Sequence, residues 1–281
     1  MSHQVTARQS LSLIVITKNE EHCIERCLRS VDADEIIVVD SGSTDRTVEI
    51  ARAAGARVVI MPDWPGFGPQ KSRALALATG DWVLSLDADE WINPEFGGLI
   101  RDAINAPDAP AAYQIVRHSR FCGKTIKFGS WSSDWLVRLF KRGQARFSDH
   151  IVHEGIVVDG QVRRISVSVD HDSIESWSDA EDKIERYSKA AAQRMISMGR
   201  RASPLSAPLH GIGTFLRVYV LFLGFLDGAA GFGSALYTTR YSIAKWRRVA
   251  EYSKRNAGQS LSNADAAAIA AEGFQPPSGS L

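Results

Sequence analysis

The sequence has few cysteines and almost no net charge, and each shortage excludes a class of protein. Its three cysteines, Cys23, Cys27 and Cys122, are too few and too unevenly spaced for a disulfide framework or a zinc motif. Lys and Arg total 33 against 32 Asp and Glu, so the chain has no overall surplus of positive charge for nucleic acid. We therefore expect no disulfide-rich module, no zinc module and no nucleic-acid partner.

Two nucleotide-binding glycine motifs are also missing. No Gly-x-Gly-x-x-Gly follows the first apolar run, and no complete Walker motif (Gly-x-x-x-x-Gly-Lys-Ser/Thr) occurs. Neither a dinucleotide cofactor nor a P-loop is therefore supported. Residues 1–10 are polar and lack the basic and then apolar segments of a secretory signal, so we expect a reducing, cytoplasmic location.

The N-terminal third of the chain alternates apolar runs with amphipathic segments. The runs are short and rich in β-branched side chains, as in buried strands. The segments between them have apolar residues spaced as on one face of a helix. The four predicted strands are 11–17, 35–39, 57–61 and 82–86. Strands that alternate with helices predict a parallel sheet with right-handed crossovers.

Polar residues follow three of these strands directly, at Thr17–Glu20, Asp40–Gly42 and Asp87–Asp89. The carboxyl ends of parallel strands meet at one edge of a sheet, where such folds bind ligands, so we expect one pocket there. With the period of a strand, Asp87 and Asp89 point to the same side, and no neighbouring Lys or Arg pairs with them. Two hard oxygen ligands suit a divalent cation that carries a phosphate. The alternative is a solvated acidic turn, because Asp-x-Asp is a common tripeptide.

Three motifs in this order resemble family 2 glycosyltransferases of the GT-A fold. They are TKNEE (17–21), VVDSGSTD (38–45) and LSLDADEW (84–91). They look most like the bacterial lipopolysaccharide-core β-1,4-glucosyltransferase subgroup, which LFLGFLDG (221–228) also resembles. The resemblance covers about residues 11–175. It implies an α/β fold that is Rossmann-like, with a mostly parallel sheet flanked by helices.

The resemblance implies nucleotide-sugar contacts at the first two strand ends. In this family the residues that match Thr17 and Asp40 contact the nucleotide base. Asn19 and Glu20 belong to the same motif, and we include them in the nucleotide-sugar site.

The resemblance also implies a metal site with Mg²⁺ or Mn²⁺. The Asp-x-Asp of the family reaches the ribose and the metal-bound diphosphate, which here means Asp87 and Asp89. In some related enzymes a later histidine completes the metal shell, and His171 is the candidate here. The alternative for His171 is a structural role.

A basic residue in the helix before the Asp-x-Asp strand commonly approaches the donor in this family. Lys71 and Arg73 lie in that region, and the alternative for both is a solvated helix face. The sequence departs from the family at Ser72, where related sequences often carry Asn, so a donor contact there is not implied.

Acceptor and base candidates lie further along the chain. Two more strands are predicted at 113–117 and 135–141, and Trp131 in the loop between them is our candidate platform for a sugar face, with ordinary packing as the alternative. The family's inverting displacement needs one general base for the acceptor hydroxyl. Glu154 is our first choice and Asp149 our second.

An apolar stretch at 209–239 is interrupted by Arg217, Asp227 and several glycines, so it is too broken for a simple membrane span. We expect it to lie in the bilayer surface, helped by a basic cluster of five residues opposed by Asp227 alone. The cluster consists of Arg217, Arg240, Lys245, Arg247 and Arg248. The alternative is a buried helical hairpin or a dimer surface.

The sequence therefore predicts three parts: a GT-A catalytic domain (1–175), a membrane-associated helical extension (176–255) and a flexible tail (256–281). The predicted activity is metal-dependent, inverting transfer of a hexose, most simply glucose from UDP-glucose. The expected acceptor is a lipid-linked saccharide such as lipopolysaccharide inner-core heptose, at the inner face of the cytoplasmic membrane. The alternatives are transfer to polyprenyl phosphate, a non-catalytic sugar-nucleotide-binding scaffold, or a glycoside hydrolase, which needs paired carboxylates flanking a bond.

Overall fold

The structure is a computed structural model that describes residues 8–132, 134–148 and 155–255. The chain forms two compact units. The first contains residues 1–118 and 134–171, and the second contains 119–133 and 172–281. The predicted tail, 256–281, lies outside the described residues, and the predicted domain boundaries stay a prediction.

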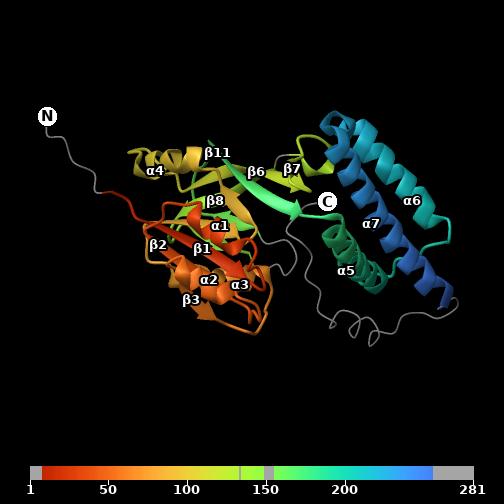
Figure 1. The fold of residues 1–281 in the computed structure, drawn as a ribbon, viewed down its shortest axis with the longest axis horizontal. Helices are drawn as coiled ribbons and strands as arrows, with labels where there is room; N and C mark the ends of the chain where they lie inside the picture. The colour runs from red at the N-terminus through yellow and green to blue at the C-terminus, as the bar shows by residue number, and fades with distance from the viewer. Residues whose placement is uncertain (1–7, 133, 149–154, 256–281) are drawn as a thin grey trace. The chain divides into compact units, whose positions relative to one another are not determined.

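The first unit is built on a curled sheet flanked by helices, which confirms the predicted fold class (Figure 1). Its strands follow the order β3-β2-β1-β4-β8-β6-β11-β5. The first four are parallel, whereas β8 pairs antiparallel with β4 and with β6. The elements are β1 (Leu11–Thr17), α1 (Ile24–Arg29), β2 (Glu35–Asp40), α2 (Thr47–Ala53), β3 (Arg57–Ile60), α3 (Phe67–Leu77), β4 (Trp82–Asp87), β5 (Glu90–Ile92), η1 (Pro94–Phe96), α4 (Gly97–Asn105), β6 (Ala112–Phe121), β8 (Asp134–Lys141), β9 (Ala145–Phe147), β10 (Ile156–Val158) and β11 (Val162–Ile174).

The two faces of the sheet are covered by different helices, because successive side chains of a strand point to opposite sides. In β1, Leu13 and Val15 pack with α1, α2 and α4 on one face. Ile14 and Ile16 pack with α3 and β9 on the other face. A strand buried on both faces needs an unbroken apolar run, which is what the sequence has at 11–17.

The register of the parallel strands brings their polar ends to one level. Thr17 pairs with Asp40 across β1 and β2, and Ile16 pairs with Asp87 across β1 and β4. The expectation that three strand ends meet at one edge is therefore confirmed.

The Asp-x-Asp is not one continuous strand. Strand β4 ends at Asp87, Ala88 and Asp89 form a turn, and β5 begins at Glu90 and pairs with β11. The expectation that one strand runs through Asp87 and Asp89 was wrong, so strand alternation does not determine the sides to which these two carboxylates point.

The second unit is helical, and both α5 and α6 pack against α7 (Figure 1). Its elements are β7 (Lys124–Thr125), η2 (Gly129–Trp131), α5 (Trp177–Ser197), α6 (Ser206–Phe215), the π-helical segment η3 (Leu216–Leu221), η4 (Gly224–Asp227) and α7 (Gly228–Arg255). Among the described residues no single helix has the length and hydropathy of a membrane span. One bent pair, Ser206–Leu221 with Gly224–Arg255, meets that test jointly, with a bend of 69°.

Candidate functional site

Asp87, the last residue of β4, is buried between two cations. Its Oδ1 lies 2.7 Å from Lys71 Nζ on α3, and its Oδ2 lies 3.0 Å from a terminal nitrogen of Arg138 on β8. Burial by itself would raise the pKa of the Asp87 carboxyl, but Lys71 and Arg138 outweigh it and hold that pKa well below its usual range. The expectation that no Lys or Arg pairs with this carboxylate was wrong, because α3 and β8 reach it from distant parts of the chain.

Glu90 extends the pair into a buried charge network. Its Oε1 accepts a 2.5 Å hydrogen bond from Arg138, and its Oε2 accepts one of 3.1 Å from the Asp87 N–H. Arg117 on β6 lies 3.7 Å from Glu90 and 3.2 Å from Asp134. Arg117 and Arg138 were not predicted as site residues from the sequence. A lone arginine within the apolar run of a predicted strand was the available signal, since a buried charge requires a partner.

Asp89 and His171 form a second pair beside this network. Asp89 Oδ2 lies 3.1 Å from His171 Nε2, and the Asp89 side chain is 31% exposed while the histidine is buried. Burial tends to lower the pKa of His171, but the Asp89 carboxylate outweighs it and raises that pKa. The structure thus brings together two of the three predicted metal ligands.

The donor chemistry of Asp89 and His171 fits a divalent cation, because one offers a carboxylate oxygen and the other an imidazole nitrogen. Asp87 fits less well as a direct ligand, since each of its oxygens already faces a cation. In this arrangement Asp87 instead fixes Lys71 and Arg138 next to the place where Asp89 would hold the ion.

Thr17 and Asp40 lie side by side at the ends of β1 and β2. Thr17 Oγ1 is buried and has no hydrogen-bond partner among the described residues. Asp40 Oδ1 accepts hydrogen bonds of 2.9 Å from the N–H groups of Gly42 and Ser43, and its Oδ2 accepts one from the Ser43 hydroxyl. Gly42 has φ +84°, a conformation that glycine adopts without strain. Asp40 therefore fixes this turn. The Thr17 hydroxyl, which has no hydrogen-bond partner among the described residues, is available to bond a ligand.

Asn19 joins the loops that follow β1 and β2. It has φ +56°, and its Oδ1 accepts a 2.8 Å hydrogen bond from the Thr44 N–H. Its own N–H donates to Ser43 Oγ at 2.8 Å, and the Glu20 N–H donates to Thr47 Oγ1 at 2.7 Å. These bonds hold the two loops in one position at the strand ends.

Lys71 and Arg73 have different partners although both lie on α3. Lys71 is buried against Asp87, as described above. Arg73 lies 2.5 Å from Asp63 and donates to Gln70 Oε1 at 2.9 Å. The geometry therefore brings Lys71, and not Arg73, to the Asp87 carboxylate. The donor contacts of both residues stay predictions.

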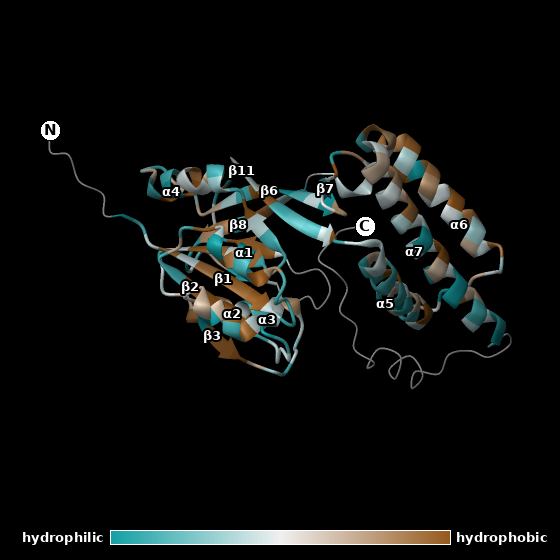
Figure 2. Ribbon diagram, in the orientation of Figure 1, coloured by the Kyte–Doolittle hydropathy of each residue, from teal (hydrophilic) through white to brown (hydrophobic). Residues whose placement is uncertain are grey.

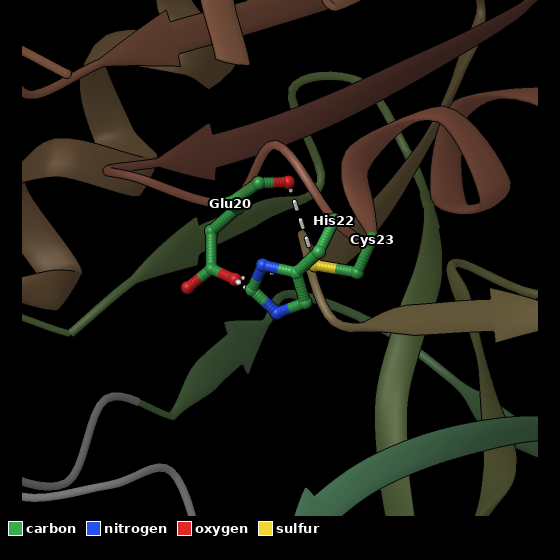
Figure 3. Close-up of side chains that lie close together, drawn as sticks. All are labelled: Glu20, His22 and Cys23. Atoms are coloured by element: carbon green, nitrogen blue, oxygen red, sulfur yellow. Dashed lines mark hydrogen bonds and ion pairs between the residues drawn. The ribbon is translucent and has the colours of Figure 1, made fainter. Parts of the chain in front are cut away.

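Glu20, His22 and Cys23 gather at the start of α1, with potential ligand atoms within 4.8 Å of one another (Figure 3). Cys23 Sγ donates to Glu20 Oε2 at 3.2 Å, and His22 Nε2 lies 3.7 Å from that oxygen. Burial and the Glu20 carboxylate raise the pKa of the Cys23 thiol far above its ordinary value. In this arrangement the Cys23 thiol anchors the Glu20 carboxylate at the start of α1.

Trp131 belongs to the second unit, where it packs in an aromatic cluster. Its ring centroid lies 5.3 Å from that of Tyr237 and 6.0 Å from that of Phe121. Its role as an acceptor platform stays a prediction. The two candidate bases, Glu154 and Asp149, lie outside the described residues.

A curled, mostly parallel sheet with helices on both faces and polar strand ends at one edge defines a GT-A-like fold. Residues 12–167 match the sequence profile described as Glycosyl transferase family 2, and the chain belongs to this family. The chain is a glycosyltransferase, and the resemblance seen in its three motifs is confirmed.

The similarity to individual relatives covers more of the chain than residues 12–167. A glycosyltransferase of Rickettsia typhi is 31% identical over 258 residues, which cover 86% of each chain. The lipopolysaccharide core biosynthesis glycosyltransferase LpsC of Rhizobium meliloti is 28% identical over 244 residues, covering 83% of this chain and 89% of LpsC. Glucosyl-3-phosphoglycerate synthase of Mycobacterium tuberculosis, solved with Mn²⁺ and UDP, is 32% identical over 40% of this chain and 44% of its own, with a TM-score of 0.34.

Proposed function

We propose that this protein is an inverting, metal-dependent hexosyltransferase that uses a UDP-sugar, most simply UDP-glucose. The observation that carries the proposal is the Asp89–His171 pair beside the Asp87 carboxylate, at the strand ends of a family 2 domain. The proposed acceptor is a lipid-linked saccharide such as lipopolysaccharide inner-core heptose, which the similarity to LpsC supports. We place the enzyme on the inner face of the cytoplasmic membrane.

Each residue of the site has a task in this reaction. Thr17 and Asp40 would contact the base, and the bonds of Asn19 would hold their loops still. Asp89 and His171 would hold Mg²⁺ or Mn²⁺, which when bound neutralises charge on the leaving diphosphate. Asp87 keeps the Lys71 ammonium in place, and charges fixed before the reaction cost no reorganisation during it.

The base must take the proton of the acceptor hydroxyl on the side opposite the diphosphate. Glu154 is the proposed base, with Asp149 as the second candidate. A polyprenyl-phosphate acceptor is already an anion and needs no strong base, so the two acceptor classes make different demands on Glu154.

The proposal is tested by incubating the full chain with a panel of UDP-sugars and Mg²⁺ or Mn²⁺. Slow UDP release without acceptor, and faster release with a lipid-linked saccharide, is the expected result. NMR of the product should show an anomeric configuration opposite to that of the donor. Transfer only to polyprenyl phosphate supports the alternative acceptor, and UDP-sugar binding without any turnover supports a scaffold.

Metal binding is tested apart from turnover, by titrating Mn²⁺ calorimetrically into the protein with UDP. His171→Ala should weaken Mn²⁺ binding, whereas His22→Ala, outside the proposed metal pair, should not. Equal affinity in the parent and in His171→Ala would remove His171 from the ligand set.

A further inference from the structure

Exposed apolar side chains concentrate on one part of the second unit. Twelve of the nineteen large hydrophobic residues that are exposed in the described chain lie between Leu205 and Ile243. Seven of the twelve lie at residues 216–227, the segment between α6 and α7, which we call the apolar bend. They are Leu216, Val220, Leu221, Phe222, Leu223, Phe225 and Leu226. Figure 2 shows hydrophobic residues on α6 and around this bend.

Helix α6 has its large and small residues on the opposite sides from those expected in water. Leu209, Ile212 and Leu216 recur at helical spacing and are exposed, whereas Ala207 and Gly211 are buried. A Cβ on Gly211 would lie 2.5 Å from Ile243 Cγ1, so α6 and α7 approach closely through small residues. A helix of a water-exposed surface buries its large apolar face. Small residues between helices and large apolar ones outside are typical of helices in lipid.

An apolar groove runs between the same two helices. Its cavity volume is about 330 Å³, and its lining includes Ile212, Phe215 and Ile243. A groove of this kind suits the acyl chains of a bilayer, which would cover both the groove and the outer stripe of α6.

The two charged residues of the bend already have partners within the unit. The Asp227 carboxylate accepts hydrogen bonds from the N–H groups of Lys127 (3.0 Å) and Phe128 (2.8 Å). The Arg217 guanidinium lies 4.9 Å from the centre of the Phe222 ring. A carboxylate with two hydrogen bonds costs less to remove from water, and a long arginine can reach back to the headgroups.

Basic residues lie away from the bend, at the far ends of the helix pair. Residues 176–255 contain 13 Lys and Arg against 6 Asp and Glu, although the whole chain has a net charge of +1. Arg200 and Arg201 precede α6, and Lys254 and Arg255 end α7. The bent pair is thus apolar at one end and basic at the other, which complements a bilayer with anionic headgroups.

Part of the predicted basic cluster is neutralised by partners within the unit. Arg240 pairs with Glu181 at 3.0 Å, and Arg248 pairs with Glu185 at 2.5 Å. Arg247 pairs with Glu251 at 3.0 Å, and burial lowers the pKa of Lys245. The expectation that Asp227 alone opposes the cluster was wrong, because α5 supplies two glutamates. Apolar contact must therefore contribute more to lipid binding than charge does.

We propose that the apolar bend enters one leaflet of the bilayer as a re-entrant element, with α6 and α7 both returning to the same surface. This inference rests on the membrane association proposed above. The arm before the break consists of the ten residues of α6 and the six of η3, and at about 1.5 Å each it is at most about 24 Å long, which is less than a hydrocarbon core of about 30 Å. This arm is too short to cross the whole core upright, and the 69° break after Leu221 changes the direction of the chain before the far side.

Flotation of the full chain with phosphatidylcholine–phosphatidylglycerol vesicles tests the insertion. The parent should float at low and at high salt, because apolar contact is not screened. Leu221→Glu/Phe225→Glu should reduce the floating fraction at least about tenfold, since each buried side chain contributes enough transfer free energy for such a change. Leu99→Glu is the matched control, because Leu99 is 44% exposed on α4 and Phe225 is 45% exposed. Leu99→Glu should float like the parent.

The depth to which each position enters the bilayer is measured with a fluorophore attached to a single cysteine, introduced at Leu221, Leu209 or Leu99. Cys122→Ser removes the exposed native thiol, and Cys23 and Cys27 are buried. Lipids brominated near the chain ends should quench the label at 221 most strongly. Lipids brominated near the headgroups should quench the label at 209, and neither should quench the label at 99.

Each other outcome overturns the inference in a distinct way. Equal shallow quenching at 221 and 209 means that the pair lies flat on the surface. A label at 221 that reacts with a membrane-impermeant reagent enclosed in the vesicles means that the pair spans. A parent that never floats and sediments as a dimer means that the bend is a contact between copies. UDP release is measured on the same samples, so a parent that floats without turnover contradicts only the proposed activity.

Discussion

Asp87 is held by two cations, Lys71 and Arg138. At the scale of one residue, we expect the loss of either cation to lower the free energy of unfolding. Arg138→Met leaves Asp87 and Glu90 buried with one cation fewer. The free energy of unfolding should fall by about 3–5 kcal/mol, the usual result of breaking a buried ion pair. Arg73→Met is the control, because its partner Asp63 is exposed, and that pair should be worth less than about 1 kcal/mol. Urea denaturation of the three proteins measures both.

The effect of Arg138→Met should depend on pH in a defined direction. The depressed pKa of Asp87 means that its ionised form stabilises the native state above the ordinary carboxyl pKa. This stabilisation is lost as the pH falls towards the folded-state pKa. The difference between parent and variant should therefore be largest near pH 7 and should shrink below about pH 4. A difference that grows on acidification would contradict the assignment.

Asp89 is the residue whose change should separate metal binding from folding. Its side chain is partly exposed and touches His171, so Asp89→Asn keeps the shape and removes a charged oxygen. Mn²⁺ affinity in the presence of UDP should fall about tenfold or more, with the melting temperature little changed. Metal-dependent UDP release should fall with it. Asp63→Asn, on the exposed surface, should change neither quantity.

Glu154 should affect transfer without affecting donor binding. A general base acts on the acceptor hydroxyl, so Glu154→Gln should leave the Kd for UDP-sugar unchanged and lower turnover by about 100-fold to 10,000-fold. Asp149→Asn is the comparison. A large loss for Asp149→Asn with a normal rate for Glu154→Gln would exchange their roles. Normal rates for both would favour the polyprenyl-phosphate acceptor.

At the scale of elements, the parallel strands follow directly from the sequence. The predicted strands 11–17, 35–39, 57–61 and 82–86 each begin at the observed residue and end within one residue of the observed boundary. The ends of such a strand can be predicted from the sequence, because a strand buried on both faces consists of apolar residues and ends where polar residues begin. The fold class could therefore be predicted from local pattern alone.

The charge network could not be predicted in the same way, because its members come from five elements, α3, β4, β5, β6 and β8. Lys71 reaches Asp87 from α3, and Arg138 reaches it only because β8 pairs with β4, Leu139 opposite Leu84. The turn after Asp87 was missed for a similar reason. Glu90 starts a short strand that depends on pairing with β11, and pairing at that distance leaves no local signal.

Asn19 gives a prediction for the paired loops after β1 and β2. Asn19→Ala loses the bond to the Thr44 N–H but keeps a Cβ in the left-handed region, a conformation that costs an L-residue about 1–2 kcal/mol and that Asn, unlike Ala, offsets by local hydrogen bonding. Asn19→Gly loses the same bond but tolerates that backbone. We expect Asn19→Ala to be the less stable of the two in thermal unfolding. Both should bind UDP more weakly than the parent, since both release the loops.

A variant with normal UDP affinity would show that the loops keep their positions without Asn19. Equal melting temperatures for Asn19→Ala and Asn19→Gly would show that the hydrogen bond, and not the backbone conformation, is the larger effect.

At the scale of the whole molecule, the two units divide the proposed task. The first has the proposed donor site, and the second has the apolar bend. The domain boundary at residue 175 stays a prediction. Each unit is built from two separate stretches of the chain, however, since residues 119–133 belong with the helices and residues 134–171 with the sheet. A truncation at a single point therefore cuts through one of the units, whereas point changes leave both complete.

Changes at the bend should consequently alter how the acceptor is reached and not how the donor is used. Leu221→Glu/Phe225→Glu should release UDP from UDP-sugar at the parental rate when no acceptor is present, because both side chains are exposed and lie outside the donor site. With a saccharide acceptor anchored in vesicles, its transfer rate should fall in proportion to the fraction of protein that no longer floats. With the same saccharide freed from its lipid, parent and variant should transfer equally. Rates of all three reactions, measured beside flotation on one preparation, test the division. An equal rate on the vesicle-anchored acceptor would show that the bend has no part in reaching it.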